Sequence, residues 1–190
     1  MKIRLAIALV FAAALTRLLP HPDNFTPIGA MALFGAAYFN RQVLTLSVPF
    51  IALFISDLIL NNVIYRQYYP EFTLITSWWI YGAFSLVMLA GWLLLRRSVN
   101  PARVILASLA SSLIFFLVSN LSTWTETTLY PKTFAGLMTC YTAGLPFLKN
   151  TVMGDLFFSG VLFGTYALGS RYTSLSSLRS LRHSDNNDNK

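Results

Sequence analysis

The sequence predicts an all-α integral membrane bundle of six transmembrane helices, and three observations support this fold class. Charged residues make up 11% of the 190-residue chain, whereas about 25% is usual for a soluble domain. Hydrophobic residues make up 55% and aromatic residues 15%, which excludes a disordered chain. Several apolar runs also approach the roughly 20 residues that cross a bilayer as a helix. Together these observations exclude a soluble enzyme.

Five apolar runs are long enough, or nearly so, to span the membrane. They cover residues 3–19, 43–60, 74–95, 102–121 and 151–169. A sixth run, residues 27–39, has only 13 residues, so it is either a short second span or a re-entrant half helix. It begins with Pro27, a residue that suits the first turn of a helix because the missing N–H has no helical partner there.

Basic residues predict the orientation of the bundle. With six spans and a cytoplasmic N-terminus, only Arg17, Arg66, Lys132 and Lys149 of the 14 lysines and arginines fall outside. The other ten fall inside, as the positive-inside rule requires. The sequence therefore predicts a multi-pass protein of the bacterial inner membrane with both termini in the cytoplasm. If the short run does not cross, the best split is nine against five with the N-terminus outside.

One boundary follows from composition. Residues 1–170 form the predicted transmembrane domain, and residues 171–190, rich in Ser, Arg, Asn and Asp, form a predicted disordered, basic cytoplasmic tail. Its arginines suit anionic lipid at the membrane surface, which accounts for much of the +7 net charge without nucleic acid. The N-terminal segment has a second interpretation as a cleaved signal peptide, because Lys2 and Arg4 precede an apolar stretch that ends in Ala12-Ala13-Ala14.

Polar residues of different spans gather in the predicted outer leaflet, which indicates a polar cavity open to the outside. Ionisable groups inside a membrane are costly and usually face a bundle interior, so Asp57 and Asp155 should lie near each other or near a cation such as Arg17. The alternative is that each group reaches the interface or caps a helix. The candidate substrate-binding residues are Arg17, Asn24, Asp57, Asn120, Trp124, Tyr130, Asn150 and Asp155.

The predicted outer loops are longer than the inner ones and rich in aromatic residues. The longest covers residues 122–149 and contains Trp124 and Tyr130. Aromatic walls with a few polar groups are typical of small-ligand pockets, so this loop is predicted to close over a small planar ligand. An aromatic belt at the membrane interface is the alternative.

Other motifs carry less chemistry. Ala8 and Ala12 are four residues apart, a spacing that lets helices approach closely, either within the bundle or at a docking face for another membrane subunit. The sequence predicts no cofactor and no metal site. The lone Cys140 has two interpretations, as a ligand to a metal-containing molecule or as a small buried hydrophobe. Two membrane aspartates also fit an intramembrane aspartyl enzyme, but Gly154-Asp155 lacks the Gly-x-Gly-Asp pattern.

Three stretches resemble an uncharacterised family of small bacterial integral membrane proteins, a domain family of unknown function. They are residues 130–158 (YPKTFAGLMTCYTAGLPFLKNTVMGDLFF), residues 17–39 with HPDNFTPIGAMALFGAAYF, and Ile55-Ser56-Asp57-Leu58. The resemblance covers most of residues 1–170 and implies no settled function.

The layout more distantly resembles the S components of energy-coupling factor (ECF) vitamin transporters. Those proteins have six helices, bind vitamins beneath outer loops, and dock through small residues four apart on the first helix, a spacing that Ala8 and Ala12 match. The resemblance implies partners, namely the lipid bilayer, a transmembrane coupling subunit and ATPases, because the chain has no Walker motif of its own.

The leading hypothesis is a membrane protein, not an enzyme, that captures a small vitamin-like nutrient from the outer side for transport. The alternatives are a membrane scaffold of the cell envelope and, more weakly, the intramembrane aspartate-dependent enzyme.

Overall fold

The chain folds into a bundle of helices with no strand among the residues that are described. The structure is a computed structural model that describes the backbone of residues 2–39 and 42–187 and the side chains of residues 3–39 and 43–171. The helices are α1 (Lys2–Thr16), α2 (Ile28–Tyr38), α3 (Gln42–Ile59), α4 (Trp78–Leu95), α5 (Pro101–Glu126) and α6 (Phe134–Asn187), with a π-helical turn, Leu60–Ile64, at the end of α3.

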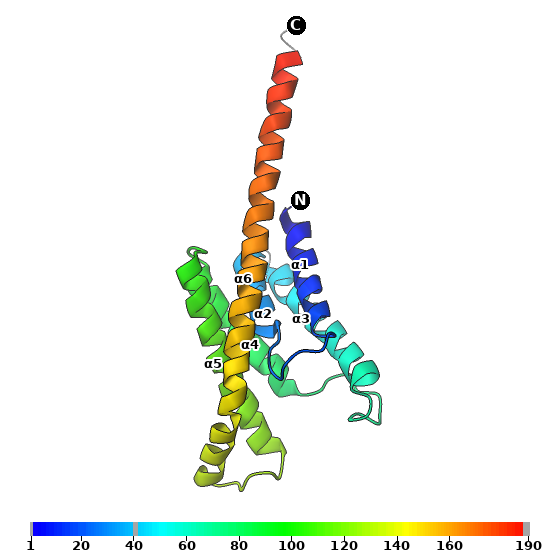
Figure 1. Ribbon diagram of the computed structural model, residues 1–190, viewed down its shortest axis with the longest axis vertical. Helices are drawn as coiled ribbons and strands as arrows, with labels where there is room; N and C mark the ends of the chain where they lie inside the picture. Colours follow the sequence, from blue (N-terminus) through cyan, green and yellow to red (C-terminus); the bar gives the residue numbers. More distant parts are fainter. Residues whose placement is uncertain (1, 40–41, 188–190) are drawn as a thin grey trace.

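Successive helices alternate in direction, as six crossings require (Figure 1). The N-terminus of α1 and the far part of α6 lie at one end of the bundle, here named the terminal end. Residues 17–27, 65–77 and 127–133 connect helices at the other end, here named the loop end.

Within the described part of the chain, four helical segments are long and apolar enough to cross a membrane. They are Val43–Ile64, Trp78–Leu95, Pro101–Glu126 and Phe134–Arg171. Two shorter apolar helices, α1 and α2, complete the bundle, and the predicted all-α membrane fold is confirmed. The 11 residues of α2 rise about 16 Å, roughly half of a bilayer core of about 30 Å.

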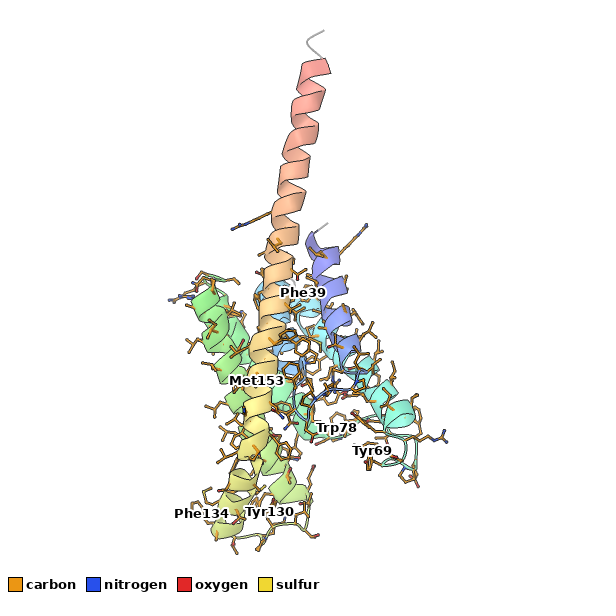
Figure 2. All side chains as sticks on the ribbon, viewed as in Figure 1. Phe39, Tyr69, Trp78, Tyr130, Phe134 and Met153 are labelled. Carbon is orange, nitrogen blue, oxygen red and sulfur yellow. The ribbon has the colours of Figure 1, made fainter. Side chains whose placement is uncertain are left out.

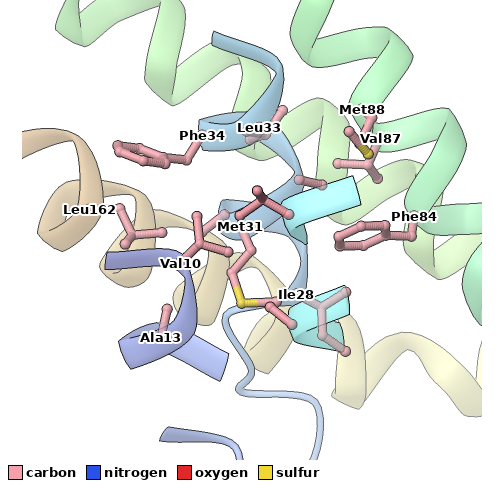
Figure 3. Packing of buried hydrophobic residues seen from close by; sticks show 14 of the residues in the cluster. Val10, Ala13, Ile28, Met31, Leu33, Phe34, Phe84, Val87, Met88 and Leu162 are labelled. Atoms are coloured by element: carbon pink, nitrogen blue, oxygen red, sulfur yellow. The ribbon is translucent and has the colours of Figure 1, made fainter. Parts of the chain in front are cut away.

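Helix α2 lies at the centre of the bundle and packs against all five other α-helices. Its residues 28–36 are all buried, as expected for a helix that is apolar on every side. Met31 and Phe34 of α2 lie among Val10 of α1, Phe84 of α4 and Leu162 of α6 (Figure 3). Small residues allow the close packing, since a Cβ on Gly35 would collide with Pro49 of α3.

The predicted long outer loop, residues 122–149, is wrong. Helix α5 continues to Glu126 and α6 begins at Phe134, so only residues 127–133 connect them. Threonines in this stretch donate to carbonyl oxygens four residues earlier, as Thr125 does to Leu121 (2.9 Å) and Thr139 to Ala135 (2.9 Å). A hydroxyl satisfied in this way fits inside a helix.

The last part of α6 covers most of the tail that the sequence predicts to be disordered. The backbone of residues 171–187 continues α6 as a helix, in the segment for which the sequence predicts disorder. Residues 188–190 of that tail lie outside the described part of the chain. The division of the chain at residue 170 stays a prediction.

Candidate functional site

A cavity of about 800 Å³ lies at the loop end of the bundle. Three of the six α-helices, α4, α5 and α6, contribute to its walls, together with Leu60 of the π-helical turn and the connections at that end. Tyr69 and Tyr130, which both line it, are labelled in this part of the molecule in Figure 2. The lining residues are Arg17, His21, Asp23, Asn24, Thr26, Leu60, Tyr65, Tyr68, Tyr69, Ile80, Phe115, Phe116, Ser119, Asn120, Thr123, Tyr130, Cys140, Ala143, Gly144, Phe147, Leu148 and Thr151.

A buried ion pair lies at the edge of this cavity. Arg17 follows the end of α1, and its Nη2 lies 2.7 Å from Oδ1 of Asp57 on α3, with both side chains buried. The Arg17 guanidinium also donates to Ser56 and to the Leu53 carbonyl oxygen, and the Tyr81 hydroxyl donates to Asp57 (3.2 Å). The expected pairing of a membrane carboxylate with Arg17 is therefore confirmed for Asp57.

One donor of this cluster has no protein acceptor. Nε of Arg17 is buried and makes no hydrogen bond in the described structure. A buried donor without a partner costs about 1–3 kcal/mol, and Arg17 is a lining residue of the cavity.

Three further predicted residues line the cavity with Arg17. Asn24 lies in the connection before α2 and has a positive φ of 61°, a conformation that Asn adopts more readily than most residues. Asn120 projects from α5, and its Nδ2 donates to the Phe116 carbonyl oxygen (2.9 Å). Tyr130 comes from the connection between α5 and α6.

Trp124 and Asn150, also predicted to bind substrate, are not cavity-lining residues. Nε1 of Trp124 donates to the Pro131 carbonyl oxygen (2.9 Å), and Lys132 Nζ lies over the indole ring. Lys132 also donates to carbonyl oxygens at the end of α5, where a cation suits the helix dipole. Nδ2 of Asn150 donates to the Asp23 carbonyl oxygen (2.9 Å). Both predicted residues hold connections in place.

Asp155 is buried but lies outside the cavity lining. Ser112 donates to its Oδ2 (2.8 Å), and its carboxyl group lies against Gly29 of α2. Gly29 is the second residue of α2, so Asp155 of α6 lies at the first turn, where negative groups suit the helix dipole. Asp155 thus anchors the start of α2. A shared catalytic site would require the carboxyl groups of Asp155 and Asp57 to interact. In the described structure no hydrogen bond or ion pair joins the two.

Glycines make room for these polar groups. A Cβ on Gly154 would lie 3.0 Å from the Thr26 nitrogen, so this glycine lets the connection before α2 cross α6 closely. A Cβ on Gly29 would collide with Ser111 and Asp155, and one on Gly144 would collide with Asn120. The Gly154-Asp155 pair therefore serves helix packing and the anchoring of α2.

Sequence reasoning missed a group of buried serines between α5 and α6. Ser108 donates to Ser159 (2.9 Å), and the one hydroxyl proton of Ser112 lies within reach of both the Ser108 carbonyl oxygen (3.0 Å) and Asp155 (2.8 Å). The spacing could have revealed them, because Ser108, Ser111 and Ser112 share one face of a helix. Tyr81, the partner of Asp57, carried no such pattern.

Cys140 lies in the cavity wall and donates to the Asn120 carbonyl oxygen (3.4 Å). Among the residues that the structure describes, no three His, Cys, Asp or Glu side chains are grouped as metal ligands would be.

Ala8 and Ala12 face outward from α1, whereas Ala6, Val10 and Ala13 of the same helix are buried. The two alanines are thus not part of the bundle core, and their face is open to another membrane helix.

Fold and site together define a helical membrane protein with a ligand-sized cavity at one end. The chain matches, over residues 1–177, the sequence model described as "Family of unknown function (DUF6580)". It belongs to that family, as its resemblance to an uncharacterised family predicted. No curated protein and no solved structure matches the chain, so the likeness in layout to S components rests on the sequence pattern alone.

Proposed function

We propose that the protein captures a small vitamin-like nutrient from the outer side of the membrane for transport. The observation that carries this proposal is the cavity of about 800 Å³ at the loop end, within the range of roughly 300–1,000 Å³ typical of small-molecule sites. Its walls combine tyrosine and phenylalanine rings with a few polar groups. Such walls suit a flat aromatic or heterocyclic molecule.

The polar groups favour a ligand that carries a hydrogen-bond acceptor. Arg17 lines the cavity, while Asp57 balances the guanidinium charge. A neutral or weakly anionic molecule then meets a donor without a strongly cationic surface. Asn120 and Tyr130 add groups that can both donate and accept.

The proposed location is the bacterial inner membrane, with both termini cytoplasmic. The basic residues support this orientation by ten to four. In the same orientation the cavity at the loop end faces outward, since the N-terminus lies at the opposite end of the bundle (Figure 1).

Release of the nutrient into the cell would need an energising partner, for which we propose a transmembrane coupling subunit with ATPases, as in ECF transporters. The exposed Ala8 and Ala12 on α1 support this part of the proposal, because small side chains let a partner helix approach closely.

Ligand capture is tested by filling the cavity. Ala143 is an exposed residue of α6 that lines the cavity, so Ala143→Trp places an indole inside it. We expect mass spectrometry of small molecules co-purified with the protein to show a ligand on the wild type, reduced at least about tenfold in the variant, a loss of some 1.4 kcal/mol in affinity. Ala135→Trp, on the same helix but outside the cavity lining, is the matched control. Equal amounts of ligand on both variants would contradict the proposal.

Docking is tested separately on α1. Ala8→Leu combined with Ala12→Leu should abolish co-purification of a coupling subunit with its ATPases while co-purified ligand stays unchanged, because the added side chains hold the helices apart. Gly82→Leu, which adds the same bulk to an exposed position of α4 with open space around it, should keep the partner. If the α1 variant instead lowers the thermal unfolding midpoint, the alanines serve the fold.

A further inference from the structure

Asp155 is a buried acid without a cation. It is 3% exposed and lies near the middle of the apolar segment Phe134–Arg171, where it is the only charged residue among residues 150–170. Asp57, the other buried aspartate with a described side chain, has the Arg17 guanidinium 2.7 Å away. No lysine, arginine or histidine in the described part of the chain forms an ion pair with Asp155.

No charged group reaches Asp155 from the elements packed around it. Helix α6 packs against α1, α2 and α5, and Gly154 lies against the connection before α2. The charged and titratable side chains described on these elements are Arg4, Arg17, His21, Asp23, Tyr38, Arg103 and Glu126. The hydrogen bonds and ion pairs of the described structure join none of them to Asp155. On α6 itself the nearest such group, Lys149, is more than one turn away.

The carboxyl group of Asp155 has neutral neighbours. Ser112 Oγ lies 2.8 Å from Oδ2, and the one proton of this hydroxyl is also within reach of the Ser108 carbonyl oxygen (3.0 Å). A Cβ on Gly29 would collide with both Oδ1 of Asp155 and the Ser111 hydroxyl, so these two oxygens face the same point at the start of α2.

These neighbours do not balance a full negative charge. The N-terminus of a helix carries a partial charge of about +0.5, and α2 has only 11 residues. A carboxylate buried without a counter-ion is costly, and such a group becomes neutral by taking up a proton. The cost is highest in the middle of a membrane-spanning segment, where the side chain cannot reach the interface.

We propose that Asp155 is a proton-binding site, with a neutral carboxyl group in the folded protein and its proton on Oδ1. In this form Oδ2 accepts from Ser112. The proton on Oδ1 points toward the Ser111 oxygen, which as a hydroxyl oxygen can accept it. Ionisation releases one proton to water and leaves one negative charge on the carboxylate.

The proton site lies close to the cavity at the loop end. Thr151, one turn before Asp155 on α6, lines that cavity, and so does Thr26, whose backbone nitrogen lies against Gly154. Loss of the proton would place an unpaired charge against the first turn of α2, the helix at the centre of the core. The site therefore makes the packing of α2 sensitive to pH, whichever molecule the cavity takes.

Infrared spectroscopy of the purified full chain tests the proposal. A protonated carboxyl group has a C=O stretching band that a carboxylate lacks, so we expect this band in the wild type at neutral pH and its loss in Asp155→Asn. Ser112→Ala should shift the band to higher frequency, because the Oδ2 carbonyl loses its donor. Ser122→Ala, which removes a hydroxyl bonded to Glu126 on the same helix, is the matched control and should leave the band unchanged.

Thermal unfolding gives a second measurement. Asp155→Asn should keep the unfolding midpoint within about 4 °C of the wild type at neutral pH, because asparagine is neutral and of equal size. Raising the pH should lower the wild-type midpoint over the range in which the C=O band disappears, since the unfolded chain releases this proton more readily than the folded one. That part of the pH dependence should be absent from Asp155→Asn.

Any of three results would overturn the proposal. The first is a wild-type spectrum in which no protonated C=O band depends on Asp155. The second is an Asp155→Asn protein that does not fold, or that loses as much stability as Asp57→Asn, because the charge itself would then be required. The third is a wild-type midpoint raised by sodium but not by potassium, with no such effect in Asp155→Asn, which would make a metal ion the occupant.

Discussion

Asp57→Asn should destabilise the protein by about 3–5 kcal/mol, the usual cost of removing one partner from a buried ion pair. The Arg17 guanidinium lies 2.7 Å from the Asp57 carboxylate, and both side chains are buried. The asparagine keeps the size of the side chain but leaves Arg17 as a positive charge without a counter-ion. Tyr81 also loses a charged acceptor for its hydroxyl. Glu71→Gln, which removes an exposed carboxylate at the same end, should change stability by less than about 0.5 kcal/mol.

A double variant separates stability from ligand capture. Arg17→Gln with Asp57→Asn replaces the ion pair by two neutral amides that can bond to each other. We expect it to be more stable than Asp57→Asn alone, because no unpaired charge remains buried. The double variant should still lose co-purified ligand, since it lacks the Arg17 donor of the cavity. Thermal unfolding in detergent and mass spectrometry of bound small molecules measure the two effects. If the effects of Arg17→Gln and Asp57→Asn on stability simply add in the double variant, Arg17 and Asp57 are not coupled.

The sequence was sufficient for the fold class and for the short central helix. Length, apolar runs and basic residues are local properties that a membrane imposes directly, and Pro27 correctly indicated where α2 begins. The boundary between α5 and α6 was missed because the apolar runs, residues 102–121 and 151–169, are shorter than the helices that contain them, and hydroxyl side chains extend both helices beyond the runs. Whether a threonine bonds to its own helix depends on the backbone already being helical.

Contacts in the site were predictable from the sequence where a buried charge required a partner. They were unpredictable where helix packing determined which residues meet. A carboxylate in a membrane needs a partner, and this requirement correctly indicated the pairing of Asp57 with Arg17. For Asp155 the neighbours are Ser112 of α5 and Gly29 of α2, neither of which a pattern of charges can reveal. Trp124 looked like a lid residue from its distance to the predicted span, but α5 extends to include it.

The start of α2 is the second place where we expect a large effect. Gly29→Ala should destabilise the protein by about 1–3 kcal/mol, the typical cost of overpacking a buried site. A Cβ on Gly29 would collide with both Ser111 and Asp155, and those side chains can move only by loosening the α5–α6 contact or the contact of Asp155 with α2. An alanine normally stabilises a helix by roughly 0.5–1 kcal/mol relative to glycine. A loss of stability on Gly29→Ala would therefore indicate the collision with Ser111 and Asp155.

Gly82→Ala is the matched control for this prediction, since a Cβ there meets nothing within 4 Å and the substitution should stabilise α4. Gly29→Ala combined with Ser111→Ala should recover part of the loss, because one of the two colliding groups is removed while Asp155 remains. Thermal unfolding midpoints of the three variants measure these differences. A Gly29→Ala protein as stable as Gly82→Ala would mean that α2 does not approach Asp155 as closely as described, and Asp155 would then be free to serve as a ligand-binding group.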